Sequence, residues 1–479
     1  MGSNHPTGPI RLFPSPDRTK ERISVPLSIL DATCARFTDT GAIWLFDGPS
    51  AEEGIGENMI VDRLQSSFIA TLNDFPQWAG QLHWAPFRPE SSNHTERWQR
   101  CMLTYGGSDS GNSDPGVEWS VVRRGYALDS IVPLTSSSSR PDDVWWDNDA
   151  FPYGDLVSPA KLALAGLKDS PGLPCMAVQI TLFACGGYGV GVRLAHLVAD
   201  AQSMMVFMHK WAANCRSAQQ KTPSSSLFGE PAFDPPRLDA RAAGNIDSPE
   251  GPDSELCAKA RALPLHRFSW WDTDAPGYSP YLVGTTQNNM PPAEILAKTT
   301  LSPSTTAPWH TWDLSRPAAS AMLHFTGDEL SRLRERARAE ATPDGDSDNC
   351  NISRSDALLA HLFRLVTQAR CSVKSSSYAA AADDEVFLDF TLEARRRVEP
   401  PLPETFLGSP LLMTHIKQFT PDAVAALLHE SAFEAAPQRL WRGFLGPRHV
   451  IVTSWLQTRV YEVDFGFPSA ARESHGEGG

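Results

Sequence analysis

Two histidine and aspartate pairs in this sequence have a spacing that could support general-base chemistry. His196 and Asp200 lie four positions apart in "LAHLVADAQSM", and His324 and Asp328 repeat the spacing in "HFTGDEL". The chain has 13 histidines, so about one such pair is expected by chance, and spacing alone does not separate the two. A neutral imidazole could take a proton from a hydroxyl or amine as it attacks a carbonyl carbon.

The surroundings of His196 predict a turn between a strand and a helix. In "GGYGVGVRLAH" large residues alternate with glycine and alanine, which indicates a strand that another backbone or a ligand can approach closely. Met204, Met208 and Trp211 then form the stripe of a helix. Such a turn can hold a catalytic histidine within reach of substrate. The alternative is a buried structural histidine whose aspartate caps the following helix.

The second pair is better explained by structure. His324 ends a strand-like segment, "AMLHF", and Asp328 falls in the first turn of a predicted helix that begins with a capping box of Thr326 and Glu329. An aspartate at that place interacts favourably with the helix dipole.

Length, charge and cysteine usage restrict the class of protein. A chain of 479 residues is expected to form two domains. Its net charge of −14 disfavours binding to nucleic acid or to acidic membranes. The eight cysteines are scattered without a C-x-x-C pair and indicate reduced thiols. No apolar run of 18 residues and no signal sequence are found, so a cytoplasmic protein without membrane contact is expected.

Strand and helix patterns are mixed in both halves, which favours an α/β or α+β class with mixed sheets. We predict a strand at 41–46, helices at 61–72 and 353–370, and a strand at 385–394 whose residues Val386, Leu388, Phe390 and Leu392 share one face. The Pro- and Ser-rich stretch 216–317 predicts an extended crossover. The predicted division is therefore an N-terminal domain at 1–215, the crossover at 216–317, and a C-terminal domain at 318–479.

Four segments in the same order resemble the motifs of the BAHD superfamily of acyl-CoA-dependent acyltransferases, especially the fungal branch that includes trichothecene acetyltransferases. They are "HLVAD" for the H-x-x-x-D motif, "EARRRVEPPLPETFLGS" for D-x-R-x-R with its Pro-Pro and aromatic-x-Gly, "TSW", and "DFGFP" for D-F-G-W-G. The similarity runs from about residue 25 to 468.

The resemblance implies two similar chloramphenicol-acetyltransferase-like domains with a channel at their interface. His196 would be the general base, and Asp200 would hold the loop, commonly through an arginine. Trp455 and Thr453 match residues placed to stabilise the oxyanion, whereas "TSW" could also be a strand with a packed tryptophan. No permanently bound cofactor and no metal are implied; acyl-CoA would be a cosubstrate.

The resemblance also implies roles on the coenzyme A side. Asp464 would form a salt bridge with Arg395 or Arg397, and Gly466 would be structural within the same motif. Arg395, Arg397 and Ser454 are the predicted coenzyme A-side residues. The alternative for "RRR" is a solvated strand end.

Three departures from the family pattern bear on this reading. Ala201 replaces the usual glycine, which is tolerable if its φ is negative, and Pro468 replaces the last glycine of D-F-G-W-G. Only eleven residues follow Pro468, so we expect a shortened, disordered C-terminus that leaves a sheet edge unpaired.

The leading hypothesis is a monomeric O-acyltransferase that moves an acyl group, with acetyl as the default, from coenzyme A to a specialised-metabolite alcohol, an amine being the less favoured acceptor. Two alternatives remain open. One is a carrier-protein condensation enzyme, although that family usually has a second histidine where Ala195 stands. The other is a non-catalytic descendant that binds a ligand or coenzyme A.

Overall fold

The computed structural model describes most of the chain. The described residues are 8–15, 21–34, 39–49, 54–107, 114–131, 145–163, 170–220, 225–288, 290–291, 293–297, 299–312, 315, 317–341, 351–372, 385–415, 419–436, 439–443, 446 and 448–468. The C-terminal segment 469–479, which we predict to be disordered, lies outside them.

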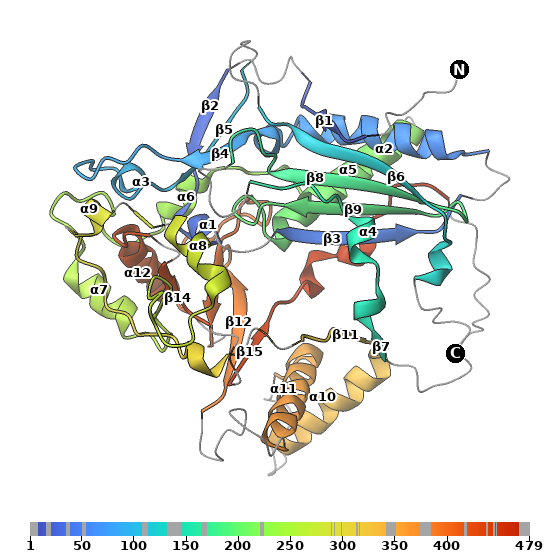
Figure 1. Cartoon of the computed structure of the whole chain (residues 1–479). Helices are drawn as coiled ribbons and strands as arrows, with labels where there is room; N and C mark the ends of the chain where they lie inside the picture. Colours follow the sequence, from blue (N-terminus) through green and yellow to red (C-terminus); the bar gives the residue numbers. More distant parts are fainter. Residues whose placement is uncertain are drawn as a thin grey trace.

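A five-stranded mixed sheet forms the centre of the N-terminal part (Figure 1). Its order is β1 (Ile10–Leu12), β6 (Val117–Arg124), β8 (Met176–Phe183), β9 (Tyr188–Leu194) and β3 (Thr40–Phe46). The β6–β8 pair is parallel and the other pairs are antiparallel. The strand predicted at 41–46 is confirmed as β3, and the run before His196 is confirmed as β9.

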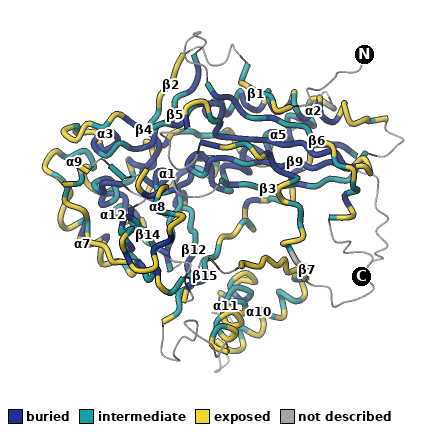
Figure 2. The backbone as a smooth tube through the Cα atoms, viewed as in Figure 1, coloured by how far each residue is buried: buried dark blue, intermediate teal, exposed yellow. Residues whose placement is uncertain are grey.

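Two long helices pack together beside this sheet. The predicted helices are confirmed as α2 (Glu57–Leu72) and α5 (Ala201–Gln220), and their predicted apolar stripes are fully buried (Figure 2). The indole of Trp211 in α5 donates a hydrogen bond of 3.0 Å to the carbonyl of Leu64 in α2. The apolar residues that recur at the helical period of 3.6 are therefore the ones that these helices bury.

The small residues of β9 allow the close backbone approach that their pattern predicts. A side chain at Gly191 would collide with the carbonyl oxygen of Leu156, which lies in the short helix α4 (Tyr153–Leu156). Only glycine permits this contact.

The remaining elements of the N-terminal part are smaller. They are the antiparallel sheet β2 (Ile23–Pro26), β5 (Cys101–Tyr105) and β4 (Gln81–Trp84), and the short helices α1 (Ile29–Thr33) and α3 (His94–Arg97).

The C-terminal part contains a smaller sheet in which β12 (Phe387–Glu393) lies between β13 (Leu411–Thr414) and β15 (His449–Val452). The strand prediction is confirmed. Leu388, Phe390 and Leu392 are half-buried, whereas Asp389 on the opposite face is fully buried. The buried Asp389 carboxylate pairs with Nδ1 of His449 in β15 at 2.8 Å.

Helices α10 (Gly327–Ala341) and α11 (Arg354–Ser372) form a hairpin at the edge of the molecule (Figure 1). Both helices are predicted from the sequence, and the capping box of α10 is confirmed because Thr326 and Glu329 bond each other's backbone amides. The hairpin joins the N-terminal part through the pairing of β11 (Ala321–Leu323) with β7 (Trp145–Asp147).

The stretch 216–317 is more structured than the predicted extended crossover. It contains α6 (Pro235–Asp239), α7 (Ser254–Arg261), β10 (Phe268–Ser269), α8 (Pro280–Asn288) and α9 (Ala293–Leu296). An aromatic cluster around Trp309 and pairing of β10 with β14 (Leu440–Trp441) hold it against the C-terminal half, where α7 also packs on α12 (Pro421–Ala432). Tertiary packing stabilises these short helices despite weak periodicity. The boundaries at 215 and 317 remain predictions.

The seven described cysteines are free thiols, and five of them are buried. Cys350 lies outside the described residues. No helix among the described residues is long and apolar enough to cross a membrane.

Candidate active site

His196 lies in the turn that connects β9 to α5, as predicted. The turn is closed by a hydrogen bond of 3.0 Å from the Val198 amide to the Ala195 carbonyl. The hydroxyl of Thr40, at the start of β3, donates to the carbonyl of Ala199 at 2.7 Å. Two neighbouring strands and a helix therefore fix the backbone on which the imidazole is carried.

Ser409 determines which nitrogen of His196 can act as a base. The Ser409 hydroxyl donates its hydrogen to the carbonyl oxygen of His196, and the same Oγ lies 3.0 Å from His196 Nδ1. Because the hydroxyl has only one hydrogen, Oγ must accept a hydrogen bond from Nδ1–H. The imidazole is thereby held as the tautomer in which Nε2 carries the lone pair.

The environment keeps this imidazole neutral. Burial lowers the pKa of His196 below its ordinary value, and the hydrogen bond with its own backbone and the charges of Asp200 and Asp39 only partly oppose that effect. A base that is unprotonated at neutral pH can accept a proton. The side chain is half-buried and lines a cavity, so it is not sealed within apolar packing.

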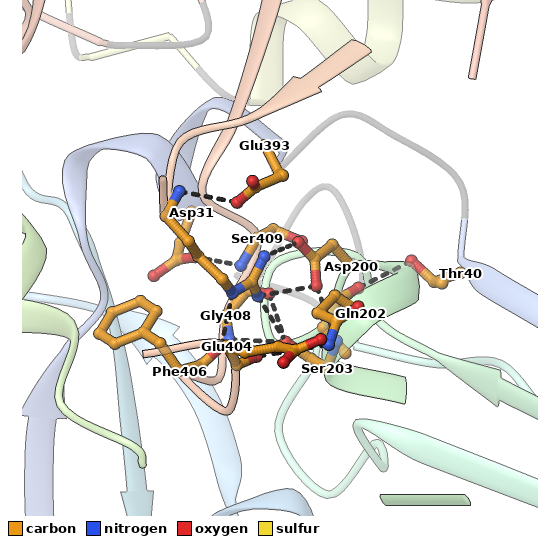
Figure 3. A network of polar contacts seen from close by, with 12 residues as sticks. Asp31, Thr40, Asp200, Gln202, Ser203, Glu393, Glu404, Phe406, Gly408 and Ser409 are labelled. Atoms are coloured by element: carbon orange, nitrogen blue, oxygen red, sulfur yellow. Dashed lines mark hydrogen bonds and ion pairs between the residues drawn. The ribbon is translucent and has the colours of Figure 1, made fainter. Parts of the chain in front are cut away.

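Asp200 forms a buried ion pair with Arg395. Its two carboxylate oxygens accept hydrogen bonds of 2.6 and 2.9 Å from the guanidinium of Arg395, and Oδ1 also accepts one of 2.9 Å from the amide of Ser203. The pair is almost completely buried. Figure 3 shows Asp200 within the surrounding network of polar contacts. A bidentate pair of this kind joins the start of α5 to the segment after β12.

The same contacts overturn the predicted salt bridge of Asp464. Arg395 is only 2% exposed, and its remaining described contacts go to the carbonyl of Phe406 and the hydroxyl of Ser203. Arg397 instead lies 3.6 Å from Glu393. Asp464 is exposed and is therefore solvated without an arginine partner, although its backbone carbonyl accepts from Arg216.

The "DFGF" segment is a turn that anchors the C-terminal part in the N-terminal core. Asp464 accepts a hydrogen bond of 2.8 Å from the amide of Gly466, and Gly466 has a φ of 78°, which favours glycine. Phe465 packs against Trp211 with ring centroids 4.9 Å apart, and Phe467 packs against Tyr188. The structural role predicted for the motif thus takes the form of aromatic packing, not of an ion pair.

A cavity of about 1760 Å³ connects the two parts of the molecule at this site. His196, Asp200 and Arg395 line it on one side, and Thr453, Ser454 and Trp455 line it beyond the end of β15. Thr453 and Ser454 are exposed to this space, and Trp455 is half-buried against the N-terminal core. Residues more than 250 positions apart in the sequence thus meet around one space.

The three predicted coenzyme A-side residues differ in how accessible they are. Arg397 and Ser454 line the cavity with partly or fully exposed side chains. Arg395 also borders it, but its guanidinium is committed to Asp200 and buried. It is suited to positioning the catalytic turn and not to contacting a diffusing cosubstrate.

Two residues of this site were not predicted from the sequence: Ser409, which contacts His196, and Asp31, which contacts Ser409. Ser409 ends the motif segment "FLGS", yet nothing in its pattern distinguishes it from a turn residue. Asp31, fully buried at the start of α1, accepts the amide of Ser409, and burial raises the pKa of Asp31 to about 7 despite hydrogen bonds from Ser28 and Ser409. Only the fold brings Ser409 to the imidazole and Asp31 to Ser409.

His324 and Asp328 do not form a second site of this kind. His324 is exposed beside β11, and Asp328 lies in the first turn of α10, as the structural explanation predicts. Ala201 begins α5 without a positive φ, so the replacement of glycine at this position is tolerated.

Comparison with known proteins agrees with this geometry. A model of the Transferase family matches residues 159–256, which contain His196 and Asp200. The acyltransferase AFT15-1 of Alternaria alternata is 27% identical over 87% of this chain and 72% of its own length, and the BAHD acyltransferase DCR of Arabidopsis thaliana is 24% identical over 87% and 71%. The chain is thus similar to BAHD acyltransferases over most of its length.

A solved structure has the same overall fold as this chain. The crystal structure of F. sporotrichioides TRI101, in complex with coenzyme A and T-2, superposes with a TM-score of 0.50 at 15% identity, covering 94% of this chain and 88% of the other. The predicted mixed α/β class with two chloramphenicol-acetyltransferase-like domains is confirmed. The prediction of an enzyme that transfers acyl groups agrees with the names of these relatives.

Proposed function

We propose that this chain is an acyl-CoA-dependent O-acyltransferase of the BAHD type in which His196 is the general base. Nε2 removes the proton of an acceptor hydroxyl while the oxygen attacks the thioester carbon. The tetrahedral intermediate then collapses, the C–S bond breaks, and the imidazolium returns the proton to the coenzyme A thiolate. No covalent acyl-enzyme is formed.

The observation that carries this proposal is the orientation of His196. Ser409 and the backbone hold Nδ1 as the donor, and the ring lines the cavity in which a substrate can approach it. A fixed tautomer removes the need to reorganise the base during the reaction.

Trp455 and Thr453 are the proposed donors to the oxyanion. Both line the same cavity as His196, and the indole N–H and the hydroxyl are donors suited to a developing negative charge. Loss of one such donor typically lowers kcat by about 10²- to 10³-fold. We expect Trp455→Phe to have an effect in this range, while Tyr461→Phe, at an exposed position just beyond, leaves kcat unchanged.

The names of the relatives support the proposed cosubstrate and the proposed class of acceptor. TRI101 was crystallised with coenzyme A, and other relatives are named as hydroxycinnamoyl-CoA transferases. Arg397 and Ser454 are proposed to contact the coenzyme A side. We propose acetyl as the donor group and a specialised-metabolite alcohol as the acceptor, with the protein acting as a monomer in the cytoplasm.

The decisive experiment follows free thiol release from acetyl-CoA with a panel of small alcohols. We expect His196→Ala to lower kcat by about 10²- to 10⁴-fold without changing the free energy of unfolding. His324→Ala is the matched control, because it removes the other H-x-x-x-D histidine. Thiol release that survives His196→Ala would contradict the proposed base, and coenzyme A binding without turnover of any acceptor would favour a binding protein.

A further inference from the structure

The segment that carries Ser409 is held from two sides, by α5 and by α1. On the α5 side, the carbonyl of Gly408 accepts hydrogen bonds from the Asp200 amide at 2.9 Å and from the Ser203 hydroxyl at 2.8 Å. On the α1 side, the Asp31 carboxylate accepts the amide of Ser409. Because this second contact is made at Ser409 itself, it bears directly on where the Ser409 hydroxyl lies.

Asp31 is fully buried, and its two carboxylate oxygens have different partners. Oδ2 accepts hydrogen bonds from the Ser28 amide at 3.0 Å and from the Ser28 hydroxyl at 2.7 Å, which completes the capping box of α1. Oδ1 accepts the amide of Ser409. The capping box requires only Oδ2, so the contact with Ser409 is additional to what starts the helix.

Gly408 permits the carboxylate of Asp31 to reach Ser409. A Cβ atom at position 408 would lie 2.7 Å from Oδ1 of Asp31, which is closer than non-bonded atoms of this kind approach each other. Gly408 also has a φ of 143°, a conformation that favours glycine. The backbone at this point therefore leaves room for the carboxylate and for no side chain in its place.

We infer that Asp31 is a positioning residue for the reaction and acts on His196 through Ser409. The carboxylate holds the Ser409 backbone, the Ser409 hydroxyl holds Nδ1–H of the imidazole, and the tautomer with a lone pair on Nε2 is thereby maintained. Asp31 exchanges no proton with the imidazole, because a backbone amide lies between them. This inference rests on the proposed function, since it concerns the orientation of the proposed base.

The first test compares thiol release by two variants of Asp31 and one matched control. We expect Asp31→Ala to lower kcat about tenfold, as expected for loss of the Ser409 hydroxyl, with the KM for acetyl-CoA unchanged. Asp31→Asn keeps an oxygen that can accept the Ser409 amide and should lower kcat by less than about threefold. Asp239→Asn is the control, because this buried aspartate binds α1 at the Ile29 amide, at 2.9 Å, and otherwise contacts His94. It should reduce stability and leave kcat unchanged.

A double substitution decides whether Asp31 acts through Ser409. If it does, Asp31→Ala causes no further loss once the Ser409 hydroxyl has been removed, so the double variant with Ser409→Ala should also be about tenfold slower than wild type. Residues that act independently would lower kcat about a hundredfold together, and that result would overturn the inference. A wild-type kcat in folded Asp31→Ala would overturn it as well, while the transferase activity stands.

A spectroscopic measurement separates failure of the inference from failure of the proposed function. Long-range ¹H–¹⁵N correlation spectra of protein labelled with ¹⁵N-histidine distinguish the two neutral tautomers of imidazole, and the signal of His196 is the one missing from His196→Ala. We expect the Nδ1–H tautomer in wild type and in Asp239→Asn, and a mixture of both tautomers in Asp31→Ala. If no substrate gives thiol release, the proposed function fails, and this spectrum still tests the inference.

The same single tautomer in wild type and in Asp31→Ala would contradict the role of Asp31. Circular dichroism establishes that each variant is folded. If Asp31→Ala does not fold, Asp31→Ser takes its place in all three measurements with the same expected results, because it keeps a polar group in the first turn of α1 but is too short to reach Ser409.

Discussion

The two sheets of the molecule differ in how they are stabilised. All eight residues of β8 are buried, and α2 and α5 cover the N-terminal sheet with fully buried apolar stripes. In the C-terminal part β12 is mostly half-buried, and α10 has no buried residue (Figure 2). The N-terminal part therefore provides a rigid frame for His196, while the C-terminal part contributes individual polar groups that reach it.

This division indicates how the site depends on each part. Ser409 and Arg395, both from the C-terminal part, fix the imidazole and its turn. Phe465 and Phe467 return the chain to the N-terminal core after the "TSW" segment. Substitutions in the core should act through stability, and substitutions at the junction should act through the geometry of His196.

The largest effect is expected from breaking the buried ion pair at the junction. Arg395→Met leaves Asp200 charged without its partner in a buried position, which should cost about 3–5 kcal/mol in the free energy of unfolding. Urea denaturation measures this loss. Arg397→Met, in which a partly exposed arginine is removed two residues away, should cost less than about 1 kcal/mol. Equal losses in the two variants would show that the junction contributes nothing specific.

A matched pair of leucines tests the contrast between the two regions directly. Leu64→Ala creates a cavity in the N-terminal core, where the side chain is 0% exposed, and should cost about 2–5 kcal/mol. Leu365→Ala in α11, where the side chain is 48% exposed, should cost less than about 1 kcal/mol. Chemical denaturation of both variants measures the difference, and a larger loss at Leu365 would contradict the contrast.

Ser409→Ala is expected to reduce activity more than stability. The substitution removes the acceptor for Nδ1–H and the donor to the His196 carbonyl, so the ring can adopt the wrong tautomer. A loss of about 1–2 kcal/mol in transition-state stabilisation corresponds to roughly a tenfold fall in kcat. Ser409→Thr should restore activity in part. A thiol-release rate in Ser409→Ala equal to that of wild type would show that the backbone alone orients the ring.

The pH dependence of activity should follow His196. Because the pKa of His196 is lowered, the imidazole becomes protonated, and so inactive as a base, only at a pH below the usual pKa of histidine. The acidic limb of the kcat/KM profile should therefore lie below pH 6.5. A profile of thiol release between pH 4.5 and 8 measures this limb. An acidic limb above pH 7 would indicate a different base.

The smallest expected effect is a pH-dependent destabilisation of the C-terminal sheet. His266 lies against His415 and His449, and burial, followed by the charges of these two histidines, lowers the pKa of His266 to about 4. The unfolded chain binds a proton on this residue at higher pH than the folded chain does. The free energy of unfolding therefore has its full value above about pH 6.5 and decreases as the pH is lowered towards 4.

His266→Phe should reduce this acid sensitivity in thermal unfolding at pH 7 and pH 5. His324→Phe, at an exposed histidine, is the control and should retain the wild-type difference between the two pH values. If the two variants respond alike, the histidine cluster is not the origin of the effect.

The sequence by itself determined the main helices and strands and singled out His196 as the proposed base. Apolar residues at a period of 3.6 or 2 specify α2, α5 and β9 because burial of one face is a local property of the pattern. The capping box specifies the start of α10 in the same way. The motif order also located His196, Thr453 and Trp455.

Only the tertiary structure decided which groups meet. Arg395 binds Asp200 and not Asp464, and Ser409 and Asp31 acquire their surroundings through contacts between distant segments. Desolvation and the competition among charges for partners depend on the three-dimensional position of each group, and no local pattern in the sequence encodes that position.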